Sequence, residues 1–307
     1  MEGSVVKVAV VSHGRNEDVF FPMWKNYYGG LFGYENLYYV DDSSDNFPEN
    51  KINAINIDSV SFPRDRWKFD DAVGELMTNK CNSLLSKYDV VIRTDVDEFV
   101  FPDTELGGWT DALSEVLKLG YVYSLGFDVI HRPKIEKGFD PSLNLFQQRA
   151  LLRIYGGFCK PHAISVPVKW SQACHRVMEC PSLGTKGPRF TTSSYLCMAH
   201  LDLFDVDVFT NRINTRGDLL RKSMNARIYN RNKILYNYPK INPYVSIDLF
   251  RGLRQGISDM MHSEPRYLPL VPESCAGYER NAPEAFLIEA PDHLELILEP
   301  KVCSSGG

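Results

Sequence analysis

Strand-like and helix-like segments alternate through the first 130 residues, and this alternation restricts the chain to a small group of folds. The run VVKVAVVS at 5–12 is continuous and β-branched, as in a strand buried on both faces. Residues 17–32 then place large apolar side chains at helical spacing, with a proline early in the segment. Alternation of this kind predicts an α/β fold: a mostly parallel, Rossmann-like central sheet flanked by helices.

The rest of the chain is less regular, and we find neither an internal repeat nor a low-complexity linker. Further strands are expected at 35–40, 53–57, 88–93, 121–129, 151–155 and 164–168, and further helices at 67–87 and 109–119. Residues 211–260 hold ten Arg or Lys against three Asp. We therefore expect one catalytic domain at 1–205, a helical, basic C-terminal extension at 206–303 packed on it, and a short tail at 304–307.

Composition narrows the class of protein. A formal net charge of −5 over 307 residues gives no reason to expect a nucleic-acid or membrane-surface partner. The seven cysteines include no C-x-x-C pair, which favours a reducing compartment. The N-terminal apolar run is too short for a signal peptide, and no window of about 18 apolar residues predicts a transmembrane helix. We expect a cytoplasmic protein.

Three short polar segments, HGRNED, DDSSDN and DVDE, each follow an expected strand, and such segments meet at the carboxyl edge of a parallel sheet. Asp95 and Asp97, one residue apart in VVIRTDVDEFVFPD, suit a hard divalent cation. The same residues could form a solvated or helix-capping acidic loop. An EF-hand is disfavoured, because Phe99 occupies the fifth position and no glycine follows.

Haloacid-dehalogenase-type phosphatases also carry D-x-D after a strand, but they have a small or β-branched residue where Phe99 stands. Taken together, RNED, DDSSD and DVDEF resemble the family 2-like glycosyltransferases, in particular the subgroup with the metal motif D-x-D-E-F and an A-type nucleotide-sugar-binding fold. The resemblance covers roughly 5–130. It continues more loosely to about 205 through KPHAISVPVKW, ACHRVMECP and YLCMAHLDLFD.

The resemblance implies a metal-dependent, inverting transfer of a sugar from a nucleotide-diphosphate donor to a glycan or lipid-linked acceptor, as in polysaccharide biosynthesis. It implies Mn²⁺ or Mg²⁺ as cofactor, held by Asp95, Asp97 and, as the third ligand, His200. Asp128 is the expected general base, with Glu179 as its rival. The residues expected at the nucleotide sugar are Arg15, Asn16, Asp41, Asp42, Arg66 and His175.

Several alternatives remain open. His175 could be a hydrogen-bonded core residue. Arg212, Arg216, Arg221 and Lys222 could face phosphates or line a solvated helix. The chain could also be a metal-dependent phosphohydrolase with a covalent intermediate at Asp95. A sugar- or nucleotide-binding module without catalytic activity is the third possibility, in which the acidic cluster is structural.

Overall fold

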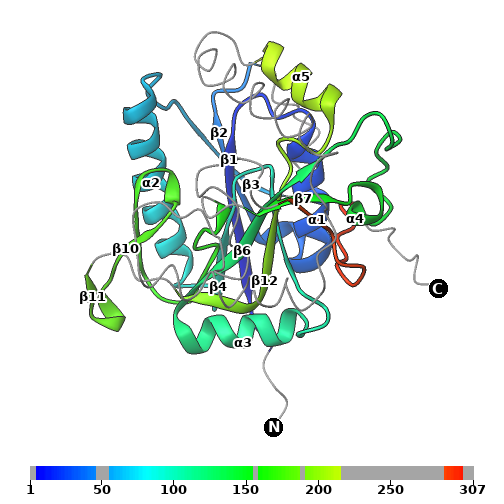
Figure 1. The fold of residues 1–307 in the computed structure, drawn as a ribbon. Coiled ribbons are helices and arrows are strands. Elements are labelled where there is room, and N and C mark those ends of the chain that lie inside the picture. Colours follow the sequence, from blue (N-terminus) through cyan, green and yellow to red (C-terminus); the bar gives the residue numbers. More distant parts are fainter. Residues whose placement is uncertain (1–4, 46–54, 155–157, 187–190, 216–286, 300–307) are drawn as a thin grey trace, which may run out of the picture.

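A ten-stranded sheet with helices packed against it forms the core of the computed structural model, which describes residues 5–45, 55–154, 158–186, 191–215 and 287–299 (Figure 1). The sheet has the order β13-β7-β6-β8-β4-β1-β2-β3, and β12 pairs with both β6 and β5. Its strands are β1 (Val8–Gly14), β2 (Leu37–Asp42), β3 (Asn56–Val60), β4 (Val90–Arg93), β5 (Glu98–Pro102), β6 (Tyr121–Ile130), β7 (Leu151–Ile154), β8 (Ala163–Ile164), β12 (Thr192–His200) and β13 (Leu287–Glu289).

The expected alternation of strand and helix is present in the N-terminal part. β1 pairs in parallel with β2 and with β4, and β2 pairs in parallel with β3. The first five residues of β1 are buried, as its β-branched sequence predicts. The helices are α1 (Phe20–Phe32), α2 (Arg66–Leu84), α3 (Trp109–Leu119), α4 (Leu145–Gln148) and α5 (Val206–Thr215), with short 3-10 helices at Tyr34–Asn36, Gln172–Cys174 and Pro181–Leu183.

The sheet is mixed, so the expectation of a mostly parallel sheet was wrong. β8 lies between β4 and β6 and runs antiparallel to both, and β5, β7 and β13 also pair in antiparallel orientation. Parallel neighbours need a crossover of about a dozen residues, usually a helix. Between β6 and β8 the described chain has no α-helix longer than the four residues of α4, and β7 and β8 both pair antiparallel with β6. Apolar patterns reveal strands, but they do not encode strand direction.

A smaller three-stranded sheet of β9 (Lys169–Trp170), β10 (Val177–Cys180) and β11 (Thr185–Lys186) lies beside α2. Of the expected C-terminal extension, the structure describes α5 and 287–299. β13 within that second stretch pairs with β7 in the main sheet. Arg216, Arg221 and Lys222 lie outside the described residues. Within the described ranges, no helix combines the length and apolar character that crossing a bilayer requires.

The carboxyl ends of β1 and β2 point toward the end of the molecule at which α5 lies (Figure 1). β2 continues through its two aspartates, so Asp41 and Asp42 are the last residues of a strand rather than loop residues as expected. Both are buried. This end of the sheet therefore carries the acidic residues that the sequence singled out.

Candidate active site at the acidic edge of the sheet

The DVDE motif forms a tight turn between β4 and β5. The backbone N–H of Glu98 donates to the carbonyl of Asp95 at 3.0 Å, and the N–H of Asp95 donates to a side-chain oxygen of Glu98 at 2.9 Å. Glu98 is fully buried, whereas the Asp95 side chain is 30% exposed. The turn thus directs one carboxylate inward and leaves another at the surface of the site.

Asp95 lies between two cationic side chains. Its Oδ1 contacts Arg93, and Lys160 Nζ donates to its Oδ2 at 2.7 Å and to Glu98 Oε1 at 2.5 Å. Burial alone would raise the pKa of Asp95, but the charges of Arg93 and Lys160 outweigh it and hold the pKa well below its ordinary value. Asp95 is therefore ionised, and both of its oxygens are engaged. His13, at the end of β1, completes the surroundings with Nδ1 at 3.9 Å from Asp95 Oδ1.

Asp97 lies between Arg212 and His200. Arg212 Nη1 donates to Asp97 Oδ2 at 2.5 Å, and His200 Nε2 lies 3.8 Å from the same oxygen. Burial would raise the pKa of Asp97, but the two neighbouring cationic groups lower it below its ordinary value. Asp97 of the acidic motif and His200, selected from the C-terminal half of the sequence, therefore face one another.

His200 is the last residue of β12 and is held there by Asp128 on the neighbouring strand β6. The distance between His200 Nδ1 and Asp128 Oδ1 is 2.6 Å, and Phe158 stacks on the imidazole with ring centroids 4.3 Å apart. The other oxygen of Asp128 contacts Arg153. Burial would lower the pKa of His200, but the bond to Asp128 and the charge of Asp97 raise it. Asp128 fixes which ring nitrogen faces Asp97.

The donor atoms fit a divalent cation. Carboxylate oxygens suit Mg²⁺ and Mn²⁺, and imidazole is a common metal ligand when neutral. Two ligands of one such ion, each about 2.1 Å from it, can stand up to about 4.2 Å apart. The 3.8 Å between His200 Nε2 and Asp97 Oδ2 is within that limit. As the described side chains stand, no group of three or more His, Cys, Asp or Glu is arranged around a common ion position.

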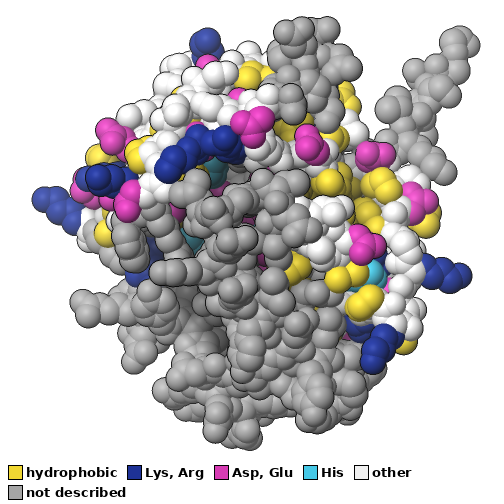
Figure 2. All heavy atoms as spheres, turned by 90° about the horizontal axis from the view of Figure 1, so that it is seen from above, with side chains coloured by type: hydrophobic (Ala, Val, Ile, Leu, Met, Phe, Trp, Pro, Cys, Tyr) yellow, Lys and Arg dark blue, Asp and Glu magenta, His cyan; other side chains and the backbone are white. Residues whose placement is uncertain are grey.

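The loops after β1 and β2 are tied to one another beside this turn. Asn16, at a positive φ of 53°, donates its backbone N–H to Ser44 Oγ at 2.9 Å and its side-chain amide to Asp45 at 2.8 Å. Arg15 lies 3.3 Å from the same aspartate. Asp41 accepts from the N–H of Ser44 at 3.1 Å. Figure 2 looks onto this end of the molecule, where acidic and basic side chains are interspersed over the described surface.

Asp42 connects the end of β2 to the segment after β3. It accepts from the backbone N–H of Phe62 at 2.9 Å and from Arg64 Nη1 at 2.5 Å. His13 packs edge-on against Phe62, with ring centroids 6.3 Å apart. The rings of His13 and Phe62 therefore lie beside Asp42 at the end of β2, close to the acidic turn.

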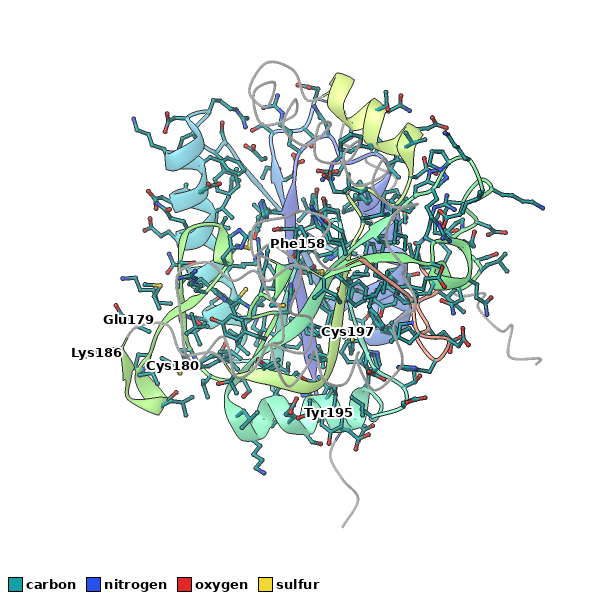
Figure 3. The ribbon with its side chains drawn as sticks, viewed as in Figure 1. Phe158, Glu179, Cys180, Lys186, Tyr195 and Cys197 are labelled. Atoms are coloured by element: carbon teal, nitrogen blue, oxygen red, sulfur yellow. The ribbon has the colours of Figure 1, made fainter. Side chains whose placement is uncertain are left out.

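Three expected residues remain: His175, Arg66 and Glu179. His175 is exposed, yet it is near enough to Lys160 and Asp95 for their charges to act on its imidazole. Arg66 begins α2, and its side chain is outside the described part of the chain. Glu179 lies on β10 at the outer edge of the molecule, well away from the centrally placed Phe158 (Figure 3).

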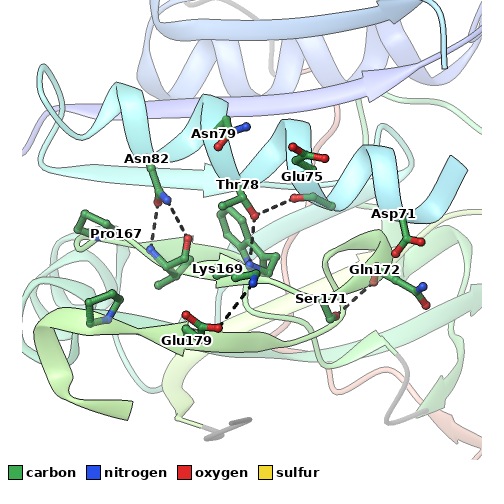
Figure 4. A pocket seen from close by; sticks show the side chains of 14 residues that line it. Asp71, Glu75, Thr78, Asn79, Asn82, Pro167, Lys169, Ser171, Gln172 and Glu179 are labelled. Atoms are coloured by element: carbon green, nitrogen blue, oxygen red, sulfur yellow. Dashed lines mark hydrogen bonds and ion pairs between the residues drawn. The ribbon is translucent and has the colours of Figure 1, made fainter. Parts of the chain in front are cut away.

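Glu179 lines a separate groove of about 670 Å³ between α2 and β9 and β10 (Figure 4). Its side chain is 53% exposed and lies 3.6 Å from Lys169 Nζ. Asn82 lines the same groove. Its side-chain amide donates to the carbonyl of Val168 at 2.8 Å and accepts from the N–H of Val168 at 3.0 Å, so it holds α2 against this wall of the groove. This geometry does not bring Glu179 together with the acidic turn.

Sequence reasoning missed two carboxylates and a lysine at this end of the sheet. Glu17 and Asp202 both bind Arg212, and Lys160 bridges Asp95 and Glu98. The sequence did carry a signal for each of them: Glu17 belongs to RNED, Lys160 opens KPHAISV, and Asp202 follows the apolar run that ends at His200.

Comparisons with known proteins add little to this geometry. No family model matches the sequence, and no curated protein matches it. One solved structure that does match is the mannose-1-phosphate geranyltransferase from Thermus thermophilus. It is 11% identical, with a TM-score of 0.25, over 80% of this chain and 67% of that chain. Similarity at this level does not establish a shared function, so the function has to be inferred from the site itself.

Proposed function

We propose that this protein is a metal-dependent glycosyltransferase of the A type, which moves a sugar from a nucleotide-diphosphate donor to a glycan or lipid-linked acceptor with inversion. The observation that carries the proposal is the meeting of Asp97 and His200 at the carboxyl edge of the sheet, with Asp128 bonded behind the imidazole. Ligands of open α/β sheets bind at this edge. The arrangement resembles the carboxylate–histidine–metal triads of metal sites.

In this proposal Asp97 and His200 hold Mn²⁺ or Mg²⁺, which supplies positive charge where the nucleoside diphosphate leaves. Asp95 completes the acidic face of the site, held in its ionised form by Arg93 and Lys160. The loops that carry Arg15, Asn16 and Asp41 provide hydrogen-bonding groups for the nucleotide.

The surroundings of Asp128 favour a positioning role over the general base that we first expected. The residue is 1% exposed, and its two oxygens contact His200 and Arg153. A general base has to reach the acceptor hydroxyl, directly or through one water. The same reasoning weighs against Glu179, which lines the separate groove.

The phosphohydrolase alternative depends on Asp95 as a nucleophile. Contacts from Arg93 and Lys160 to the two oxygens of this carboxylate reduce its capacity to attack phosphorus. That alternative predicts release of inorganic phosphate without an acceptor and a phosphorylated Asp95. The transferase predicts neither.

The proposal is tested by thermal-shift measurements with UDP-, GDP-, dTDP- and CDP-sugars, with and without Mn²⁺ or Mg²⁺. A ligand at about 100 times its dissociation constant stabilises the fold by about 2.7 kcal/mol. We expect a metal-dependent shift with one nucleotide class in the native protein and in Asp58→Asn, whose aspartate pairs with Lys80 on the surface. Asp97→Asn should lose the shift. A folded native protein that responds to no nucleotide would refute the proposal.

A further inference from the structure

Arg212, on α5, binds three acidic side chains from three different loops. Its Nη1 donates to Asp97 Oδ2 at 2.5 Å and to Asp202 Oδ1 at 2.9 Å, and its Nη2 donates to Glu17 Oε1 at 3.1 Å. The guanidinium also lies over the ring of Phe20, 4.6 Å from its centroid. One side chain thus joins the loop after β1, the acidic turn and the loop after β12 to α5.

Arg212 and its three acidic partners lie almost entirely out of water. The side chains of Asp97, Asp202 and Glu17 are 9%, 8% and 3% exposed, and Arg212 is 11% exposed. Three buried carboxylates therefore surround one guanidinium. Buried charge is costly unless it is paired, so Arg212 stabilises the carboxylates that it contacts for as long as it stays beside them.

Arg212 and the proposed metal ion compete for the same atom. Asp97 Oδ2 is the oxygen that Arg212 Nη1 binds, and it is also the oxygen that His200 Nε2 faces. A divalent ion between His200 and this oxygen would stand beside the guanidinium. Two positive charges that close repel strongly where little water screens them.

We propose that Arg212 is an exchangeable internal cation, which holds Asp97 in the metal-free protein and must leave that oxygen when the metal binds. This inference rests on the proposed function, because the metal is the one assigned to Asp97 and His200. Asp202 and Glu17 keep Arg212 at the site after the exchange. Arg212 therefore lowers the affinity for free metal and couples metal binding to the position of α5.

The test is the affinity for Mn²⁺ alone, measured by isothermal titration calorimetry without any nucleotide. We expect Arg212→Ala to bind Mn²⁺ about tenfold or more tightly than the native protein, because a charged hydrogen bond no longer competes for Asp97. Arg132→Ala is the matched control: Arg132 is also mostly buried and acid-paired, but its partners are Glu136 and Glu289. Its affinity should equal that of the native protein.

A second variant keeps the test valid if Arg212→Ala does not fold. Arg212→Gln combined with Asp202→Asn removes one positive and one negative charge together, so the net charge of the group is unchanged. This double variant should also bind Mn²⁺ more tightly than the native protein. Unchanged or weaker affinity in a folded variant would overturn the proposal, because Arg212 would then be a structural or supporting residue for Asp97.

The failure of this inference is distinguishable from the failure of the proposed function. If the native protein binds Mn²⁺, Asp97→Asn abolishes binding and Arg212→Ala leaves the affinity unchanged, the metal site stands and the exchange is refuted. If Mn²⁺ binds neither the native protein nor the folded Arg212 variants, the metal-dependent function fails, and this inference fails with it.

Discussion

His200 Nδ1 lies 2.6 Å from Asp128 Oδ1, across a parallel strand pair in which these two residues are direct partners. The contact is fixed by the register of β6 and β12 rather than by a flexible loop. It directs Nε2 of the same imidazole to Asp97.

Replacing Asp128 with asparagine should weaken metal binding without removing a metal ligand. The amide keeps the size of the side chain but loses the charge that orients the imidazole, and losses of this kind cost about 10–100-fold in metal affinity. Titration calorimetry with Mn²⁺ measures the effect, and circular dichroism checks the fold. Equal affinity in Asp128→Asn and the native protein would show that the contact has no part in metal binding.

Replacing Lys160 with methionine should destabilise the fold strongly. Lys160 is 5% exposed and is the shared partner of Asp95 and the fully buried Glu98. Removing one partner of a buried ion pair costs about 3–5 kcal/mol. Urea denaturation should show this loss, and adding Glu98→Gln should recover part of it. A double variant less stable than Lys160→Met would contradict the assignment of Lys160 as the counter-charge of Glu98.

Gly126→Ala should shift the segment that carries Phe158. A Cβ at Gly126, on β6, would come within 2.1 Å of the backbone oxygen of Phe158, so one of the two segments has to move. Overpacking of this kind lowers the free energy of unfolding by about 1–3 kcal/mol. It should also weaken Mn²⁺ binding, because Phe158 stacks on the imidazole of His200 and a shift of Phe158 would disturb that ring. Gly138→Ala is the control, because no atom lies within 4 Å of the added carbon.

Lowering the pH should lower the free energy of unfolding, because His131 is harder to protonate in the folded protein than in the unfolded chain. Burial, followed by the nearby charge of Arg149, lowers the pKa of this imidazole below its ordinary value of 6.5. Between the two pKa values the unfolded chain binds a proton that the native protein does not, so the free energy of unfolding falls as the pH drops below about 6.5. His131 Nδ1 accepts from the N–H of Val206, an acceptor role that His131→Asn retains without titrating.

Denaturation curves of the native protein and His131→Asn, recorded from pH 7.5 to 5, test this sign. The variant should lose less stability than the native protein over that range. Parallel pH dependence in the two proteins would mean that His131 keeps its ordinary pKa in the folded state.

The sequence predicted those parts of the fold that depend on local pattern. β1, α1 and α3 fall close to the expected ranges, because continuous β-branched runs and helical spacing are properties of single segments. Strand direction is not local, which explains why the short, antiparallel β8 between β4 and β6 was not foreseen. β5 was not foreseen as a strand because EFVFP by itself indicates only a return to the core.

The candidate site was predictable to a similar extent. Asp95 and Asp97 stand out because two carboxylates one residue apart follow an expected buried strand, a pattern that suits a divalent cation. His200 was selected from its place at the end of an apolar run, and the structure brings it to 3.8 Å from Asp97. Glu17 and Asp202 lie in or beside segments that the sequence singled out, but only the fold shows that both bind Arg212, 195 and 10 residues away in the chain.

β5 pairs with β12 alone among the described strands, although about a hundred residues separate the two in the chain. A ribosome adds about 5–20 residues per second. The apolar strand EFVFP is therefore synthesised several seconds or more before its partner is available. During that interval its backbone is an open template for pairing with other chains. The nascent protein should depend on a chaperone at this stage, and fragments that end before residue 192 should aggregate.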